Sequence, residues 1–79
     1  MTETEAVVNW VLQGNARKRK TINRKVSSYG LKHVVEKAIG QYIGNDSFIA
    51  AMDTLGFEKK EIKGTPNYFF NIHLERNNE

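Results

Sequence analysis

The residues of this chain that could do chemistry are mainly cations, and they are unevenly distributed. Between positions 15 and 37 there are eight Lys and Arg residues and one acid, Glu36, so this segment has a net charge of +7. Because the whole chain has a net charge of +3, the remainder sums to −4. Such a distribution creates a local positive field that attracts phosphate groups or an acidic protein surface. The competing interpretation is a solvated basic loop that only aids solubility.

Catalysis has little support in the sequence. There is no Gly-rich phosphate loop, nucleophile elbow or cluster of metal ligands. The chain has no Cys, and its two His residues, His33 and His73, are far apart. Asp46 is expected to cap a helix, whereas Glu36 and Asp53 are expected on solvent-facing helix surfaces. We therefore predict a protein that is not an enzyme and that uses no cofactor or metal.

Three helices are predicted from apolar spacing and from their end signals. The first covers 2–13, because Thr2 and Glu5 form a capping-box pattern before an apolar stripe that includes Leu12, and because Gly14 can end a helix. The second covers 28–39, with an inward stripe at Leu31, Val34, Val35, Ala38 and Ile39 and a polar face at Lys32, His33, Glu36 and Lys37. The third covers 45–55, capped by Asn45 or Asp46, with Phe48, Ile49, Met52 and Leu55 inward.

The remaining segments are predicted as strands and turns. Alternation around Ile22 indicates a short strand near 20–26, with the basic quartet 17–20 solvated before it. Residues 40–44 form a bridge in which Tyr42 and Ile43 are half-buried. A hairpin has arms at 57–62 and 68–74 around the Gly- and Pro-containing turn 63–67. In the second arm, Tyr68, Phe70, Ile72 and Leu74 share one face, and 75–79 is a frayed tail.

This order of elements indicates the fold class. Helix, strand, helix, turn, helix and two-stranded wing is the order of winged-helix domains. We therefore predict one α+β domain over 1–79, a winged helix with three helices and two to three short strands. No apolar run approaches the ~20 residues that span a membrane, and the acidic N-terminus argues against a secretory signal. The expected location is the cytoplasm.

In a helix-turn-helix, the N-terminal part of the second helix of the pair lies at base edges in the major groove. Asn can bond adenine, and the methyl groups of Ala and Thr can contact thymine. Cations that flank the helix pair would hold the phosphates. The predicted base-edge residues are Asn45, Ser47, Ala50, Ala51 and Thr54. The predicted phosphate-binding residues are Arg17, Lys18, Arg19, Lys20, Arg24, Lys25, Lys32, Lys59, Lys60 and Lys63.

One feature weighs against groove reading. The predicted recognition helix contains no Lys or Arg and carries Asp46 and Asp53, whose charges phosphate repels. An alternative is therefore that the wing or the basic run makes most of the contact with DNA, for example in the minor groove. A second alternative is a protein-binding module, since fold does not dictate function.

Part of the chain resembles a group of small uncharacterised proteins of phages and mobile elements. The resemblance is carried by Ser-Ser-Tyr-Gly-Leu-Lys-His at 27–33, by Tyr-Ile-Gly-Asn-Asp-Ser-Phe-Ile-Ala-Ala-Met at 42–52 and by Gly-Phe at 56–57, and it ends near 67–71. It implies a prokaryotic or phage context and favours regulators or small inhibitors of host machinery, including anti-defence proteins. It assigns no role to any residue.

Together these observations predict double-stranded DNA binding by a regulator or accessory factor of a phage or mobile element. The alternative is a protein-binding adaptor or inhibitor with the same fold.

Overall fold

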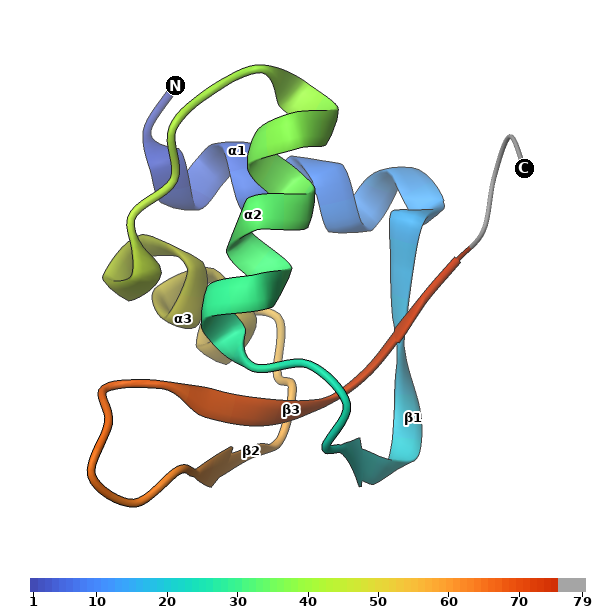
Figure 1. The fold of residues 1–79 in the computed structure, drawn as a ribbon. Coiled ribbons are helices and arrows are strands. Elements are labelled where there is room, and N and C mark those ends of the chain that lie inside the picture. The colour runs from blue at the N-terminus through green and yellow to red at the C-terminus, as the bar shows by residue number, and fades with distance from the viewer. Residues whose placement is uncertain (76–79) are drawn as a thin grey trace.

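A computed structural model describes residues 1–75 of the chain and confirms the predicted α+β class (Figure 1). The described part contains three helices and a three-stranded antiparallel sheet. Its elements are α1 (Glu3–Trp10), continued by the wide π-type turn η1 (Val11–Asn15), β1 (Ala16–Asn23), α2 (Ser28–Ile39), α3 (Asn45–Thr54), β2 (Lys59–Glu61) and β3 (Tyr68–Leu74). Of the predicted tail, 76–79 lie outside the described residues.

Helix α1 starts as predicted. The Thr2 hydroxyl accepts a hydrogen bond from the Glu5 N–H at 3.1 Å, and the Glu5 carboxylate accepts one from the Thr2 N–H at 2.9 Å. Gly14 has φ of +97°, a conformation that glycine adopts without steric cost. The prediction was wrong at Leu12, which is 70% exposed because the chain widens into η1 there instead of continuing the apolar stripe.

The sheet has the order β1-β3-β2, with the last strand of the chain in the centre. Strand β1 pairs with β3 at Ala16↔Leu74 and, after an irregularity, at Asn23↔Phe70. The predicted strand 20–26 was therefore placed too late, and the basic quartet belongs to β1 itself. Exposed Lys and Arg are well suited to an edge strand, because their charges oppose pairing with other chains.

Strand β3 divides the molecule into a core side and an outer side. Phe70 and Ile72 are fully buried against the helices, as predicted from the alternation of this arm. Asn71 points to the outer side, yet it is only 6% exposed. Its carboxamide oxygen accepts the Glu58 N–H at 2.7 Å, and its amide nitrogen donates to the Arg19 carbonyl at 3.0 Å. One side chain thus ties both edges to the central strand.

The core is filled from all three helices. Its largest fully buried side chains besides those of β3 belong to Val7, Leu31, Val35, Ile43, Phe48 and Met52. The predicted inward stripe of α2 is correct at Leu31 and Val35 but wrong at Val34, which is 40% exposed, and at Ala38, which is exposed as well. In the bridge after Gly40, Ile43 is fully buried and Tyr42 is 69% exposed, so the prediction that both are half-buried was wrong.

The caps of α2 and α3 also differ from the predictions. Ser27 precedes α2 but makes no side-chain cap, whereas Ser28 is buried and accepts the Tyr68 N–H at 3.2 Å. Gly44, not Asn45 or Asp46, precedes α3, and its N–H donates to the Glu3 carboxylate at 2.8 Å. These bonds replace local caps by links between distant segments.

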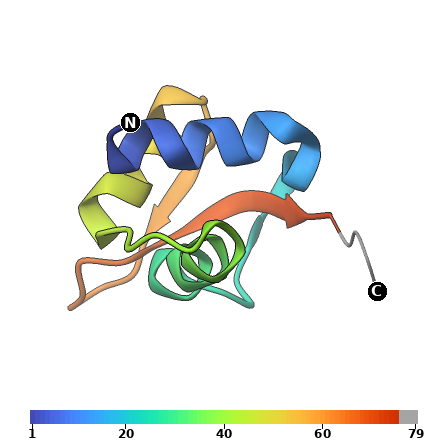
Figure 2. The ribbon, with the colours of Figure 1, turned by 90° about the horizontal axis from the view of Figure 1, so that it is seen from above.

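The helices lie together on one side of the molecule, with the sheet below and to the right in Figure 1. Seen from above, β3 runs between the projections of α1 and α2, and α3 lies beside the N-terminal end of α1 (Figure 2). The outer side of the sheet is therefore not covered by a helix. Within 1–75, none of the helices is both long and apolar enough to cross a membrane.

Candidate nucleic-acid interface

The basic quartet is divided by the register of β1. Arg17 pairs with His73 and lies on the outer side, whereas Lys18 pairs with Ile72 and lies on the core side. All four side chains of the quartet are exposed. Arg17 forms an ion pair with Glu75, and Arg19 donates to the Thr21 hydroxyl at 2.9 Å. Two neighbouring cations of the quartet, Arg17 and Lys18, are thus on opposite sides of the sheet by their register.

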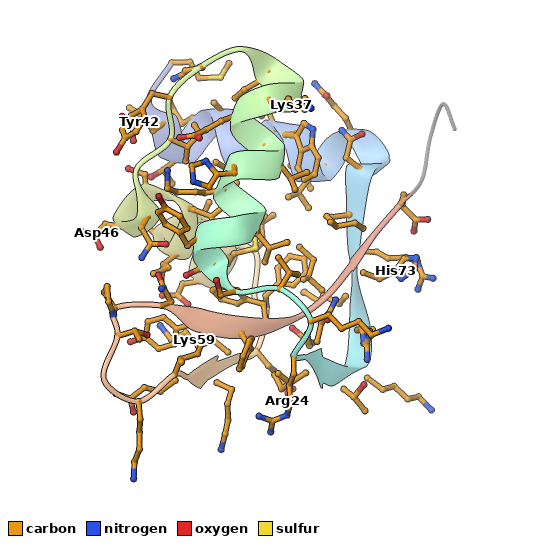
Figure 3. All side chains as sticks on the ribbon, viewed as in Figure 1. Arg24, Lys37, Tyr42, Asp46, Lys59 and His73 are labelled. Atoms are coloured by element: carbon orange, nitrogen blue, oxygen red, sulfur yellow. The ribbon has the colours of Figure 1, made fainter. Side chains whose placement is uncertain are left out.

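Further cations lie at the far end of the sheet. Arg24 and Lys25 follow β1 directly, and Lys60 lies on β2 opposite Phe69. Asn23 and Lys59 both pair with Phe70, so the two edge strands meet β3 at the same level. With neighbouring strands about 4.8 Å apart, their backbones are about 10 Å from each other there. Arg24 projects outward from this end of the sheet in Figure 3.

Lys59 is held by neighbouring side chains. Its ammonium donates to the Asp53 carboxylate at 2.9 Å and lies 4.8 Å from the centre of the Tyr68 ring. The hydrogen bond to Asp53 raises the pKa of Lys59 above its ordinary value. This cation therefore links β2 to α3 and stays protonated, but the Asp53 carboxylate balances its charge, so the pair attracts phosphate less than a free lysine would.

Eight exposed cations form no ion pair among the described residues. Two of them lie apart: Lys18 is on the core side of β1 and Lys37 is on α2. We call the other six the basic sheet surface. They lie on β1, in the turn after it, on β2 and in the hairpin loop. They are Arg19, Lys20, Arg24, Lys25, Lys60 and Lys63.

Lys32 was predicted to contact phosphate, but its side chain is buried. The residue is 4% exposed, and its ammonium donates to the Glu36 carboxylate at 3.0 Å. The rings of Tyr29 and Tyr42 lie 5.1 and 5.0 Å from that ammonium, a cation–π arrangement on two sides. The assignment to phosphate binding is therefore corrected. Lys32 instead joins α2 to the bridge before α3.

The predicted base-edge residues are not all available on α3. Ala51 is fully buried in the core. Asn45 donates to the Asn67 side chain at 3.1 Å and so fastens the start of α3 to the hairpin loop. Ser47 is half-buried, and Ala50 and Thr54 are exposed. The hypothesis of base reading by Asn45 and Ala51 therefore loses its geometric support.

What remains exposed on α3 is acidic or neutral. Asp46 and Asp53 lie on the same exposed side of the helix as Ala50 and Thr54. Asp46 lies at the start of α3 in Figure 3, well away from Arg24 and His73. Nearby carboxylates repel the phosphate backbone, so this helix is poorly suited to lie in a groove of DNA.

Among the acids of residues 1–75, Glu36 has the pKa that is shifted most strongly. Its carboxylate accepts the Ile43 N–H at 2.9 Å, the Lys32 ammonium at 3.0 Å and the His33 Nδ1 at 2.8 Å. The backbone bond from Ile43, followed by the bond from Lys32, lowers the pKa of Glu36 from 4.5 to about 2. The lowered pKa could not be predicted from the sequence, because its main cause is a backbone donor, Ile43, that lies seven positions further along the chain.

This shift predicts a pH dependence of stability. Because the folded pKa of Glu36 is lowered, its carboxylate stabilises the fold fully above the unfolded value of 4.5, and this contribution is lost as the pH falls toward about 2. Replacing Glu36 with Gln should therefore flatten the loss of stability between pH 4.5 and 2, which urea unfolding at a series of pH values would measure. Wild-type and variant curves of equal slope in this interval would contradict the assignment.

Comparison of the chain with protein families, with curated proteins and with solved structures finds no match in any of the three.

Proposed function

We propose that this protein binds double-stranded DNA through the basic sheet surface, as a small winged-helix domain. The proposal of a winged helix is supported by the element order α1-β1-α2-α3-β2-β3 and by the sheet order β1-β3-β2, in which the terminal hairpin is the wing. The role we propose is a binding role without catalysis, in a cytoplasmic regulator or accessory factor of a phage or mobile element. That biological context rests on the sequence resemblance alone.

One observation carries the proposed mode of contact. Of the eight exposed cations that form no ion pair among the described residues, all but Lys37 lie on the sheet, in the turn after β1 or in the hairpin loop. Helix α3 carries two aspartates and no Lys or Arg. Most protein–DNA hydrogen bonds go to phosphate and sugar and set orientation. We therefore place the DNA backbone against β1, the turn after it and the wing, with α3 turned away from the groove. The expected result is affinity with little preference for sequence.

The dependence of binding on salt tests this function. If about five cations each contact one phosphate, log K should fall against log salt with a slope of about −4 to −5. Affinity for a labelled duplex should then drop roughly 10²- to 10³-fold between ~50 and ~200 mM salt, which fluorescence anisotropy would measure. A series of unrelated duplexes should give similar curves. Absence of affinity for every duplex at the lowest salt would reject the proposal.

A further inference from the structure

An open apolar hollow lies on the core side of the sheet, away from the basic sheet surface. Its volume is about 350 Å³, and it lies where η1, β1 and the end of α3 meet. Val11, Ala16, Leu55 and Phe57 provide apolar lining. Arg17, which is already paired with Glu75, and Lys18 also line the hollow. This volume is near the lower end of the ~300–1,000 Å³ typical of ligand sites, so the hollow suits one or two large side chains rather than a whole helix.

Leu12 lines one side of this hollow and is largely exposed to solvent. It is 70% exposed, although it belongs to the segment that continues the apolar stripe of α1. A single exposed Leu is ordinary on a protein surface. Here, however, it adjoins a concave apolar lining, so a side chain that enters the hollow would cover both Leu12 and the lining at once.

Lys18 supplies a positive charge to the same place. It is the partner of Ile72 in the sheet and therefore points to the core side, where its ammonium lies 5.8 Å from the centre of the Phe57 ring. A Cβ added at Gly56 would lie 3.1 Å from this ammonium, so the lysine side chain packs against the turn that follows α3. Among the described residues no carboxylate forms an ion pair with Lys18. The rim of the hollow is therefore cationic and open to an acidic group.

We infer that this hollow docks a short acidic segment of a partner protein, with a large apolar side chain in the hollow and a neighbouring carboxylate on Lys18. Charge complementarity selects this partner, because the hollow joins apolar walls to an unpaired cation. A duplex presents no apolar side chain that could enter it. The inference stands apart from DNA binding, since neither Leu12 nor Lys18 belongs to the basic sheet surface.

Selection from a displayed library of random short peptides on the intact protein tests the inference. Enriched peptides are expected to share a Leu, Ile, Met or Phe next to Asp or Glu. Synthetic copies should bind the Leu12→Ser and the Lys18→Glu variants at least tenfold more weakly than the wild type. The Lys63→Glu variant has the same charge change at a distant position and should bind them like the wild type. Exchanging the peptide acids for Lys should restore binding to Lys18→Glu.

Several outcomes would overturn the inference. One is the absence of enriched peptides with this pattern, and another is equal binding to all the variants. A third is self-association of Lys18→Glu without loss of peptide binding, which would make Lys18 only a guard against edge pairing. Because Leu12→Ser should leave duplex affinity unchanged, failure of peptide docking is distinguishable from failure of DNA binding.

Discussion

Replacing Arg24 and Lys60 together with Gln is expected to weaken duplex binding roughly tenfold or more at ~0.1 M salt and to reduce the salt slope by about 2. These cations lie at opposite edges of the sheet, at the level where both edge strands pair with Phe70, and neither has an ion pair among residues 1–75. Each loss removes one phosphate contact and releases one counterion fewer. Anisotropy titrations at several salt concentrations would measure both quantities.

The matched control for this prediction is Lys37→Glu. This single change alters the net charge by two, as the double variant does, but Lys37 lies on α2, far from Arg24 in Figure 3. Its effect on duplex affinity should be several times smaller than that of the double variant. Equal losses in the two proteins would mean that overall charge, rather than the sheet, determines binding.

Replacing Phe70 with Ala is expected to have the largest effect on stability, a loss of about 3–5 kcal/mol. Phe70 is fully buried in the central strand, with its ring centroid 6.0 Å from that of Phe48 in an edge-to-face arrangement. The change removes buried apolar area and leaves a cavity between the sheet and α3. Since a domain of this size is stable by only roughly 4–12 kcal/mol, this variant should lose a large fraction of its free energy of unfolding.

Urea unfolding followed by circular dichroism would measure the loss. Leu12→Ala is the control, because it removes a large apolar side chain from a position that is 70% exposed, and its expected cost is below about 0.5 kcal/mol. A small loss for Phe70→Ala, comparable with the control, would show that β3 does not form the centre of the core.

Much of the fold could be predicted because its signals are local. The capping box at Thr2 and Glu5, the positive φ at Gly14 and Gly40 and the alternation of β3 depend on neighbours within a few positions. Strand β1 could not be placed in this way, because its partner lies more than 40 residues later in the chain. Its pairing with β3, rather than its own sequence, makes a basic segment into a strand.

The candidate site shows the same division. The cations and the lack of Lys and Arg on the third helix could be read from residue types alone. The burial of Lys32 could not be predicted in this way. It depends on the Tyr42 ring from the following bridge and on the Glu36 carboxylate, which also accepts the Ile43 N–H. The opposite directions of Arg17 and Lys18 follow from the register with β3. The residue type of Asn45 predicts contact with a DNA base, whereas its amide donates a hydrogen bond to Asn67 in the hairpin loop.

The central claim is that the sheet and wing, not α3, contact DNA. Titration of ¹⁵N-labelled protein with a short duplex, followed by amide chemical shifts, tests it most directly. We predict that the largest shift changes occur at the basic sheet surface and that Ala50 and Thr54 change little. Large changes along α3, with the sheet residues unaffected, would contradict the account.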